Sequence, residues 1–456
     1  MAQDAHGLTL TTDDAGARAW DHVIAGYLGY RADTAARLAA LLETAPDFGL
    51  AHCLGGYFAL LGFNAAFLPA AAAAAARARP LLAGARAREQ AHLAALDAWA
   101  AGDAPRAVAI WDAILADHPA DALAFRLAHF VNFWLGRADR MRASVVAVEP
   151  HWDPAWPAYT SLLACRCFAF EECGLYLEAE AAGRAAIARD PGDLWAAHGV
   201  AHVLEMQGRR SEGIGWVAQL APGWAAANNL RHHLYWHAAM FHLERGEHDR
   251  VLALYDTGFR DLASPLTRAQ PDLYIDVQNA VSMLYRLGRH GVDVGDRWTE
   301  LADKATARIG DAQSAFTLPH WAMALAATGR QAEGARFLDA LAAFAAGESP
   351  LAALVRAVAL PICRAALLAP LDPAAAVAAM RPALADMPNL GGSHAQQDVL
   401  EQIFVTCARQ AGLADDVALA LERFAGRRRM PPAAFSLWRD ADDRGGSGAA
   451  GTFYMS

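Results

Sequence analysis

The sequence has almost no lysine and no excess of positive charge. Lys304 is the only lysine, the other basic residues are arginines, and the 456 residues carry a formal net charge of −10. A protein that binds nucleic acid usually gathers basic residues on one face. The densest basic run, residues 427–429, consists of three arginines, which suit a solvated helix end. We therefore expect no nucleic-acid partner.

Several motifs of common enzyme classes are also missing. The chain has no Gly-x-Ser-x-Gly nucleophile elbow, no phosphate-binding loop and no dinucleotide fingerprint. Their absence argues against ATP-dependent and nicotinamide-dependent chemistry. Convincing runs of alternating β-branched residues are absent as well, so no β-sheet is expected.

Signals for export or membrane insertion are weak. The first ten residues, MAQDAHGLTL, contain neither a basic region nor an apolar run, so we expect a cytoplasmic protein. The longest uncharged stretch, residues 48–76, is long enough to span a membrane but is interrupted by Gly55, Gly56, Gly62 and Pro69. It is better interpreted as two short Ala-rich helices that break near Pro69. We expect no membrane partner.

The six cysteines do not follow the spacing of a zinc finger. In a cytosolic protein they stay reduced. Cys165 and Cys167 would point to different faces of one helix, and we interpret them as small core residues.

Helix-breaking segments recur along the chain and indicate a repeat. Four prolines, Pro119, Pro150, Pro191 and Pro222, lie 31 to 41 residues apart, which is the length of one helical hairpin. Glycines fall between these breaks, as at Gly136, Gly174, Gly208, Gly246, Gly288 and Gly329, where a helix would reverse direction. The fold class predicted from this pattern is all-α, a tetratricopeptide-like superhelix of helical hairpins (an α-solenoid) with more than 60% helix. Residues 1–440 would form this single array, and residues 441–456 a flexible tail.

The most unusual stretch is rich in histidine. His198, His202 and Glu205 are four and three residues apart, so they share one helix face, and Trp195 lies just above them. His233 and His237 repeat the four-residue spacing on the next inner helix. We predict that these four histidines and Glu205 line one interior cavity.

Two chemistries are open to such a cluster. Imidazoles suit general acid/base work near neutral pH, and they also suit zinc or iron. The order His-Glu-x-x-His of the zinc peptidases is absent, and no cysteine lies within the histidine segments. We therefore expect no cofactor and no tightly held metal, although a metal at the cluster is kept as the alternative. The plainest alternative is that each ring is a core histidine bonded to a carbonyl or carboxylate.

Further polar residues recur at helical spacing downstream. Ser393 is placed to cap a helix that begins at His394. Capping and surface hydrogen bonds also explain such residues taken singly. Catalytic roles are assigned to His198, His202, Glu205, His233, His237 and Asp398, and substrate-binding roles to Trp195, Trp236, Asp276, Asn279, His320 and His394.

Six segments resemble the tetratricopeptide repeat protein 38 family. The most specific is the histidine block at residues 193–208. The others are residues 168–176, 233–237, 284–287, 295–298 and 391–398. The resemblance implies a helical repeat fold and carries no generally assigned activity. Gln397 stands where the family pattern has arginine, and Leu318 and Pro319 stand where an aspartate precedes His320.

Two functions follow from the sequence. The first is a small-molecule enzyme, a hydrolase or lyase that uses histidine acid/base chemistry in the interior of the superhelix. The second is a scaffold that binds a peptide or protein in its groove. Peptide-binding repeats tend to line the groove with asparagine, lysine and arginine, whereas this chain offers histidine, tryptophan and carboxylates, which favours the enzyme. The expected ligand is thus a small molecule or peptide in the concave interior, and a homodimer is left open.

Overall fold

The computed structural model describes residues 2–443 and is about 74% helical, which confirms the all-α prediction. One small departure lies at the start of the chain. Strands β1 (Ala2–Gln3) and β2 (Thr9–Leu10) form a short antiparallel pair. The Asp4 side chain accepts hydrogen bonds from the backbone of His6 and Leu8, and this tight turn brings the two strands together.

The described helices group into two compact units. Unit 1 comprises the chain up to Val203 together with Ala218–Arg231 and Ser349–Leu351. Unit 2 comprises Leu204–Val217, His232–Glu348 and the chain from Ala352 on. The single array predicted over residues 1–440 stays a prediction.

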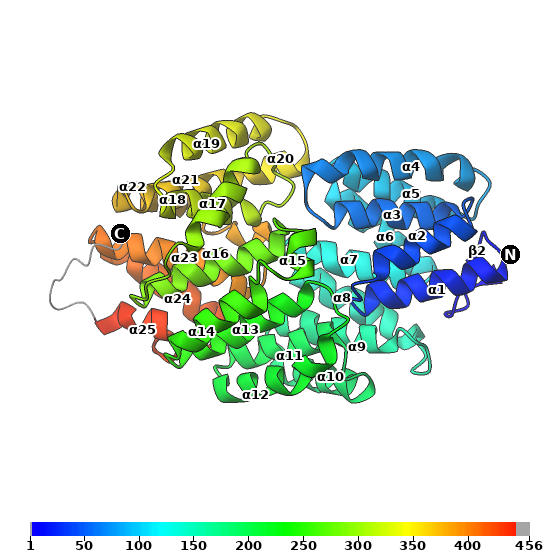
Figure 1. Cartoon of the computed structure of the whole chain (residues 1–456), viewed down its shortest axis with the longest axis horizontal. Helices are drawn as coiled ribbons and strands as arrows, with labels where there is room; N and C mark the ends of the chain where they lie inside the picture. The colour runs from blue at the N-terminus through cyan, green and yellow to red at the C-terminus, as the bar shows by residue number, and fades with distance from the viewer. Residues whose placement is uncertain (1, 444–456) are drawn as a thin grey trace. The chain divides into compact units, whose positions relative to one another are not determined.

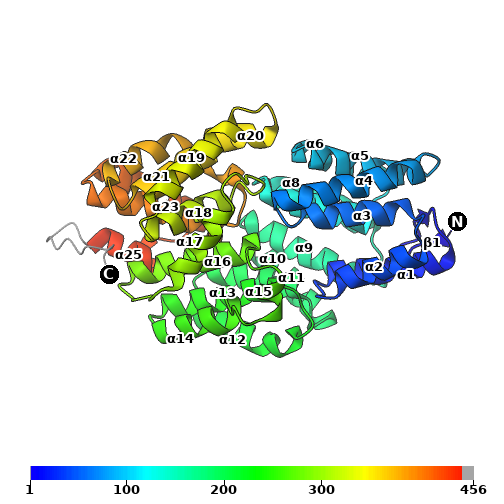
Figure 2. The same ribbon diagram turned by 45° about the horizontal axis from the view of Figure 1, so that its top comes forward.

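Unit 1 consists of helices that pack against their neighbours in the sequence (Figure 1). The helices α3, α4 and α5 lie side by side in both views (Figure 2). The α-helices of this unit are α1 (Asp14–Leu28), α2 (Thr34–Thr44), α3 (Gly49–Leu60), α4 (Leu68–Leu82), α5 (Ala87–Ala100), α6 (Ala104–Asp117), α7 (Ala122–Trp134), α8 (Ala138–Val148), α9 (Tyr159–Glu172) and α10 (Tyr176–Arg189). Its 3₁₀ turns are η1 (Ala65–Phe67), η2 (Glu149–His151) and η3 (Ala221–Trp224).

Four helices contain residues of both units. They are α11 (Leu194–Met206), α12 (Arg210–Leu220), α13 (Leu230–Glu244) and α20 (Pro350–Leu354). The histidines of interest on α11 belong to unit 1, and those on α13 belong to unit 2.

Unit 2 repeats the hairpin arrangement, with α18 and α19 packed on α21. Its α-helices are α14 (His248–Leu254), α15 (Pro265–Ala269), α16 (Tyr274–Arg289), α17 (Arg297–Ala307), α18 (Thr317–Ala327), α19 (Gln331–Ala345), α21 (Leu360–Leu368), α22 (Pro373–Met380), α23 (His394–Gln410), α24 (Ala414–Arg428) and α25 (Ser436–Asp443). Short π or 3₁₀ segments are η4 (Tyr255–Phe259), η5 (Val355–Ala359), η6 (Arg381–Ala383), η7 (Met387–Leu390) and η8 (Pro432–Ala434).

Glycine forms the turn between the two helices of most hairpins, as predicted. At Gly136 the backbone is left-handed (φ +66°), the Gly136 N–H donates to Phe133, and the Arg137 N–H donates to Asn132. This pair of bonds satisfies carbonyls that the helix end would leave open. Four of the other predicted glycines make the same left-handed turn: Gly174, Gly208, Gly246 and Gly329.

The exception is Gly288, which lies inside α16. The chain reverses three residues later at Gly291 (φ +76°), where the Val292 N–H donates to Leu287. A glycine within the last turn of a helix does not end it; only the residue beyond the end needs the left-handed conformation.

The uncharged stretch at residues 48–76 forms α3 and the first part of α4, and Pro69 lies in the first turn of α4. A different segment, Pro350–Leu368, is long and apolar enough to cross a membrane by length and composition alone. In the structure 44% of its most apolar part is buried. Core helices of globular proteins can be equally long and apolar.

The C-terminal segment departs from the prediction in part. Helix α25 runs to Asp443, so residues 441–443 of the predicted tail are helical. The Trp438 indole is buried and donates to the Asp398 carboxylate at 2.9 Å, which fixes this helix on unit 2. Residues 444–456 lie outside the described residues.

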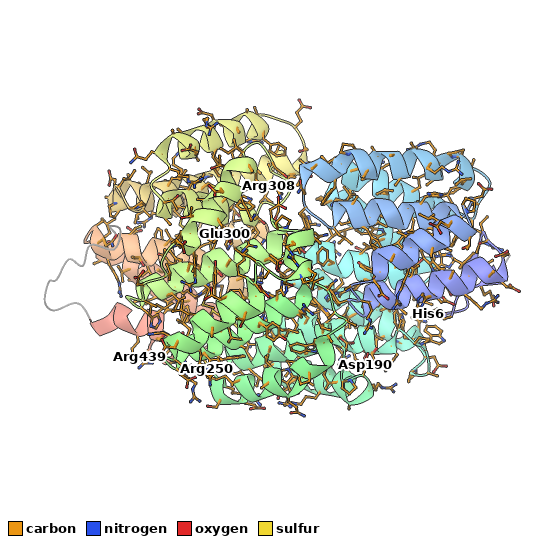
Figure 3. All side chains as sticks on the ribbon, viewed as in Figure 1. His6, Asp190, Arg250, Glu300, Arg308 and Arg439 are labelled. Atoms are coloured by element: carbon orange, nitrogen blue, oxygen red, sulfur yellow. The ribbon has the colours of Figure 1, made fainter. Side chains whose placement is uncertain are left out.

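Charged side chains outside the core lie on the surface. Asp190 at the end of α10 and Arg250 on α14 are exposed (Figure 3). His6 instead stacks on Trp156 with ring centroids 4.7 Å apart. A second set of polar side chains, which includes His198 and His202, is instead buried away from water.

Candidate active site

The site begins with two adjacent carboxylates at the C-terminal end of α9. Glu171 and Glu172 are the last residues of this helix, and both are buried. Adjacent residues on a helix point in different directions. Here both carboxylates nevertheless come within reach of one histidine ring, His202 of α11.

The α11 helix starts from a buried aspartate. The Asp193 side chain accepts from the backbone N–H of Ala196 at 2.9 Å, which satisfies the first turn. Burial raises the pKa of Asp193 to about 6. This cap fixes the start of the helix and therefore the direction in which His198 and His202 project.

His198 and His202 lie one helical turn apart and face each other. Their Nε2 atoms are 2.8 Å apart, so one ring donates and the other accepts. Both rings are buried. The two imidazoles therefore hold one proton between their facing atoms, and a change of donor moves the proton along the pair.

A carboxylate lies on the other side of the His202 ring. Glu171 Oε2 is 3.8 Å from His202 Nδ1. One donor atom from each of Glu171, Glu172 and His202 lies within 4.8 Å of the other two, and all three residues are buried. This group lies wholly within unit 1.

Aromatic rings enclose the histidine pair. The His198 ring is 4.7 Å from Trp195 and 5.1 Å from Phe168. The Arg126 guanidinium lies over the Trp195 ring, 4.5 Å from the ring centroid. Trp195 thus lies beside His198, as its position in the sequence suggested. Apolar walls of this kind are usual in small-molecule sites.

Two residues of α7 were missed by the sequence analysis. His129 and Asn132 are buried, and within residues 2–443 no hydrogen-bond partner reaches either ring nitrogen of His129 or the side-chain amide of Asn132. His129 contacts the same Phe168 and Trp195 rings as His198 does. Burial and the nearby Arg126 hold the pKa of His129 well below its ordinary value. The three-residue spacing of Arg126, His129 and Asn132 was the available signal.

The α13 histidines lie in unit 2 and have their own supports. His233 Nδ1 is 2.8 Å from the Asn279 side-chain oxygen, so Nδ1 donates this bond. The His237 ring lies 4.8 Å from the His233 ring. Burial lowers the pKa of His233 to about 4, so this ring is neutral at pH 7. His232, which had no predicted role, is 3.1 Å from the Asp276 carboxylate.

The four predicted histidines are all buried, His198 and His202 in unit 1 and His233 and His237 in unit 2. Their convergence on one interior cavity stays a prediction.

The two acidic residues assigned catalytic roles have arginine partners. Glu205 Oε1 is 3.6 Å from Arg428, and Asp398 Oδ2 is 3.7 Å from Arg286. Asp398 also accepts from Gln402 and Trp438. The carboxylate seen beside His202 is that of Glu171, which lies in one of the resemblance segments but had no assigned role. The catalytic roles of Glu205 and Asp398 stay predictions.

Several assigned substrate-binding residues make structural hydrogen bonds. Trp236 stacks on His233 and donates to Ser282 at 3.2 Å. His320 Nδ1 donates to the Phe316 carbonyl at 2.9 Å, and burial lowers its pKa to about 4.

His394 opens α23, where Ser393 forms the predicted cap and Gln396 completes a capping box. Burial, reinforced by Arg427 and Arg428, lowers the pKa of His394 to about 3.

No family model matches the chain. The resemblance to the tetratricopeptide repeat protein 38 family stays a prediction from the six segments that carry it.

Proposed function

We propose that the buried histidines His198, His202, His233 and His237 form the reaction centre of a small-molecule enzyme of the hydrolase or lyase type. The observation that carries this proposal is the facing pair His198 and His202 in unit 1, whose Nε2 atoms lie 2.8 Å apart. Such a pair accepts a proton at one ring and releases one at the other, which is the work of general acid/base catalysis.

The energetics of burial support a functional role. Taking a polar group out of water is unfavourable unless the group gains partners in the fold. Within unit 1, Glu171, His198 and His202 are all buried together. Apolar side chains of similar volume would fill the space between the helices with less loss of hydration. The presence of titratable side chains at these positions, where apolar ones would pack as well, favours a chemical role for them.

Each residue of the pair has a role in this proposal. His202 and His198 move the proton at their Nε2 atoms. The Glu171 carboxylate, 3.8 Å from His202 Nδ1, stabilises the imidazolium that forms when the pair takes up a proton. Phe168 and Trp195 supply an apolar wall beside His198, which excludes water and packs against the substrate.

The remaining assigned residues lie in unit 2. Asn279 holds the tautomer of His233, because the amide oxygen accepts only from a protonated Nδ1. Glu205 and Asp398, which pair with Arg428 and Arg286, keep their assigned catalytic roles in this proposal. The alternative, a peptide-binding scaffold, needs residues that reach the groove surface, whereas the four histidines are buried.

The test is a search for turnover in a mixture of small molecules. Purified full-length protein is incubated with a cellular metabolite extract, and the extract is compared by mass spectrometry with one treated with the His202→Gln variant. Wild-type protein should deplete one compound and accumulate its product, and the His202→Gln variant should do neither.

The matched control is His52→Gln. The His52 ring lies at the surface and contacts the Pro46 carbonyl, so its replacement should leave turnover intact. If the wild-type protein and the His202→Gln variant give indistinguishable extracts, the enzyme proposal fails and the scaffold becomes the better account.

A further inference from the structure

We propose that Glu171, Glu172 and the Nδ1 atom of His202 bind a divalent first-row transition-metal ion. The proposal rests on three buried donor residues of unit 1 whose ligand atoms lie within 4.8 Å of one another. It goes beyond the acid/base function, because it places the ion on the side of His202 that faces away from His198.

The separation of Glu171 and His202 fits a shared ion. The distance between Glu171 Oε2 and His202 Nδ1, 3.8 Å, is too long for a hydrogen bond. Two ligands that each lie about 2.0–2.2 Å from one metal are themselves roughly 3–4 Å apart. An ion between the two atoms therefore requires only small side-chain movements.

The tautomer of His202 also suits metal binding. A ring nitrogen binds a metal through its lone pair, so Nδ1 must carry no proton. In neutral His202 the proton is then on Nε2, which can donate to His198 Nε2 at 2.8 Å. A metal-binding histidine usually donates its other N–H to a fixed partner, which holds the ring in place. His198 is placed to be that partner.

The local electrostatics favour a cation. Glu171 and Glu172 are the last two residues of α9, where the helix dipole already concentrates negative charge. Both carboxylates are buried, and a nearby cation offsets the loss of hydration.

The donor set narrows the choice of metal. One imidazole nitrogen and carboxylate oxygens suit Mn²⁺, Fe²⁺, Co²⁺, Ni²⁺ and Zn²⁺ better than soft Cu⁺, which prefers sulfur. The sequence-based expectation of no metal relied on the absence of cysteine and of the order His-Glu-x-x-His, which argue only against closed structural zinc sites and the zinc-peptidase motif. Catalytic metal sites commonly combine histidine with glutamate and leave a position open.

The test is metal binding by the full-length protein after treatment with a chelator and dialysis. Zn²⁺ and Mn²⁺ are titrated by calorimetry, and Co²⁺ by visible absorption, whose bands report the coordination of the ion. We expect binding of at least one of these ions that approaches one per chain. Glu171→Gln and Glu172→Gln keep the side-chain shape and remove the charge, and each should weaken binding at least about tenfold.

His52→Gln is the matched control, because the His52 ring contacts the Pro46 carbonyl and lies outside the three-residue group. It should leave affinity unchanged, and circular dichroism should show that all variants stay helical. The ion should also raise the melting temperature of the wild type more than that of the glutamine variants.

Failure of this proposal can be told apart from failure of the proposed function. No binding by the wild type, or equal affinity in Glu171→Gln and Glu172→Gln, would overturn the metal site. If metal-free protein still depletes its substrate while His202→Gln does not, the acid/base function stands without the metal. If metal binds as expected but no compound is turned over, the metal site stands and the enzyme proposal fails.

Discussion

The Nε2 atoms of His198 and His202 lie 2.8 Å apart on successive turns of α11. Because only one proton fits between them, the protonation of one ring dictates the hydrogen-bonding role of the other. The pair therefore behaves as a single unit with two ends, and the Glu171 carboxylate lies at the outer nitrogen of His202.

The pH dependence of stability should reveal the buried neutral histidines. Burial lowers the pKa of His233 and His320 to about 4 and of His394 to about 3. In the unfolded chain these rings take up protons near pH 6.5, so below that pH the unfolded state binds more protons and stability falls. Asp193, with its pKa raised to about 6, opposes this trend only between about pH 6 and 4.

We therefore expect the melting temperature to be nearly constant from pH 7 to 8 and to fall steeply between about pH 6.5 and 4. The His320→Gln variant should show a shallower decline, because one of these contributions is gone. His52→Gln should follow the wild type. A wild-type melting temperature that does not change down to pH 4.5 would contradict the assignment of neutral buried rings.

Two helix caps should differ sharply in their importance. Asp103 caps α6 through the Arg106 N–H, and Asp121 caps α7 through the Ala124 N–H. Asp121 is in addition buried with Arg88, whose guanidinium donates to it at 2.7 Å. Asp103→Ala should cost about 1 kcal/mol of unfolding free energy. Asp121→Ala should cost about 3–5 kcal/mol, because it leaves a buried guanidinium without its carboxylate.

Chemical denaturation of both variants measures this difference. Equal losses of stability would mean that the buried ion pair contributes nothing beyond the cap. Burial opposes ionisation of Asp121, but His92 and Arg88 hold its pKa well below the ordinary value. The contribution of this carboxylate should therefore be present at pH 7 and be lost only as strongly acidic pH is reached.

The C-terminal helix should depend on one indole hydrogen bond. Trp438→Phe keeps an aromatic ring in the core but removes the N–H that donates to Asp398. Because Asp398 is buried, we expect a loss of about 1–3 kcal/mol in unfolding free energy. The exposed neighbour provides a control, since Arg439→Ala should change stability by less than about 0.5 kcal/mol. A Trp438→Phe protein as stable as the wild type would contradict the role of this bond.

The hairpins could be predicted from the sequence because their signals are local. Pro69 breaks an apolar run, and glycines such as Gly136 supply the left-handed turn that reverses the chain. Gly288 misled the prediction because a glycine one turn before the helix end looks the same in the sequence as one beyond it. The short β1–β2 pair escaped notice because two residues per strand leave no periodic pattern.

The candidate site could be predicted only where its residues share one helix. The four-residue spacing of His198 and His202 places their rings together on α11 in any context. The approach of Glu171 to His202 depends on how α9 is rotated against α11, which no local pattern encodes. His129 was missed for the same reason, since its aromatic neighbours come from α9 and α11.

The most direct test of the reaction centre is a double-mutant cycle on the facing pair, measured with the substrate that the metabolite experiment identifies. His198→Gln and His202→Gln should each lower kcat/KM by about 10²–10⁴. The double variant should be no worse than the poorer single variant, because one proton relay is removed in each case. All three proteins should keep the helical circular dichroism spectrum of the wild type. Losses that multiply in the double variant, or single variants with wild-type kcat/KM, would contradict the claim that the two rings act as one catalytic unit.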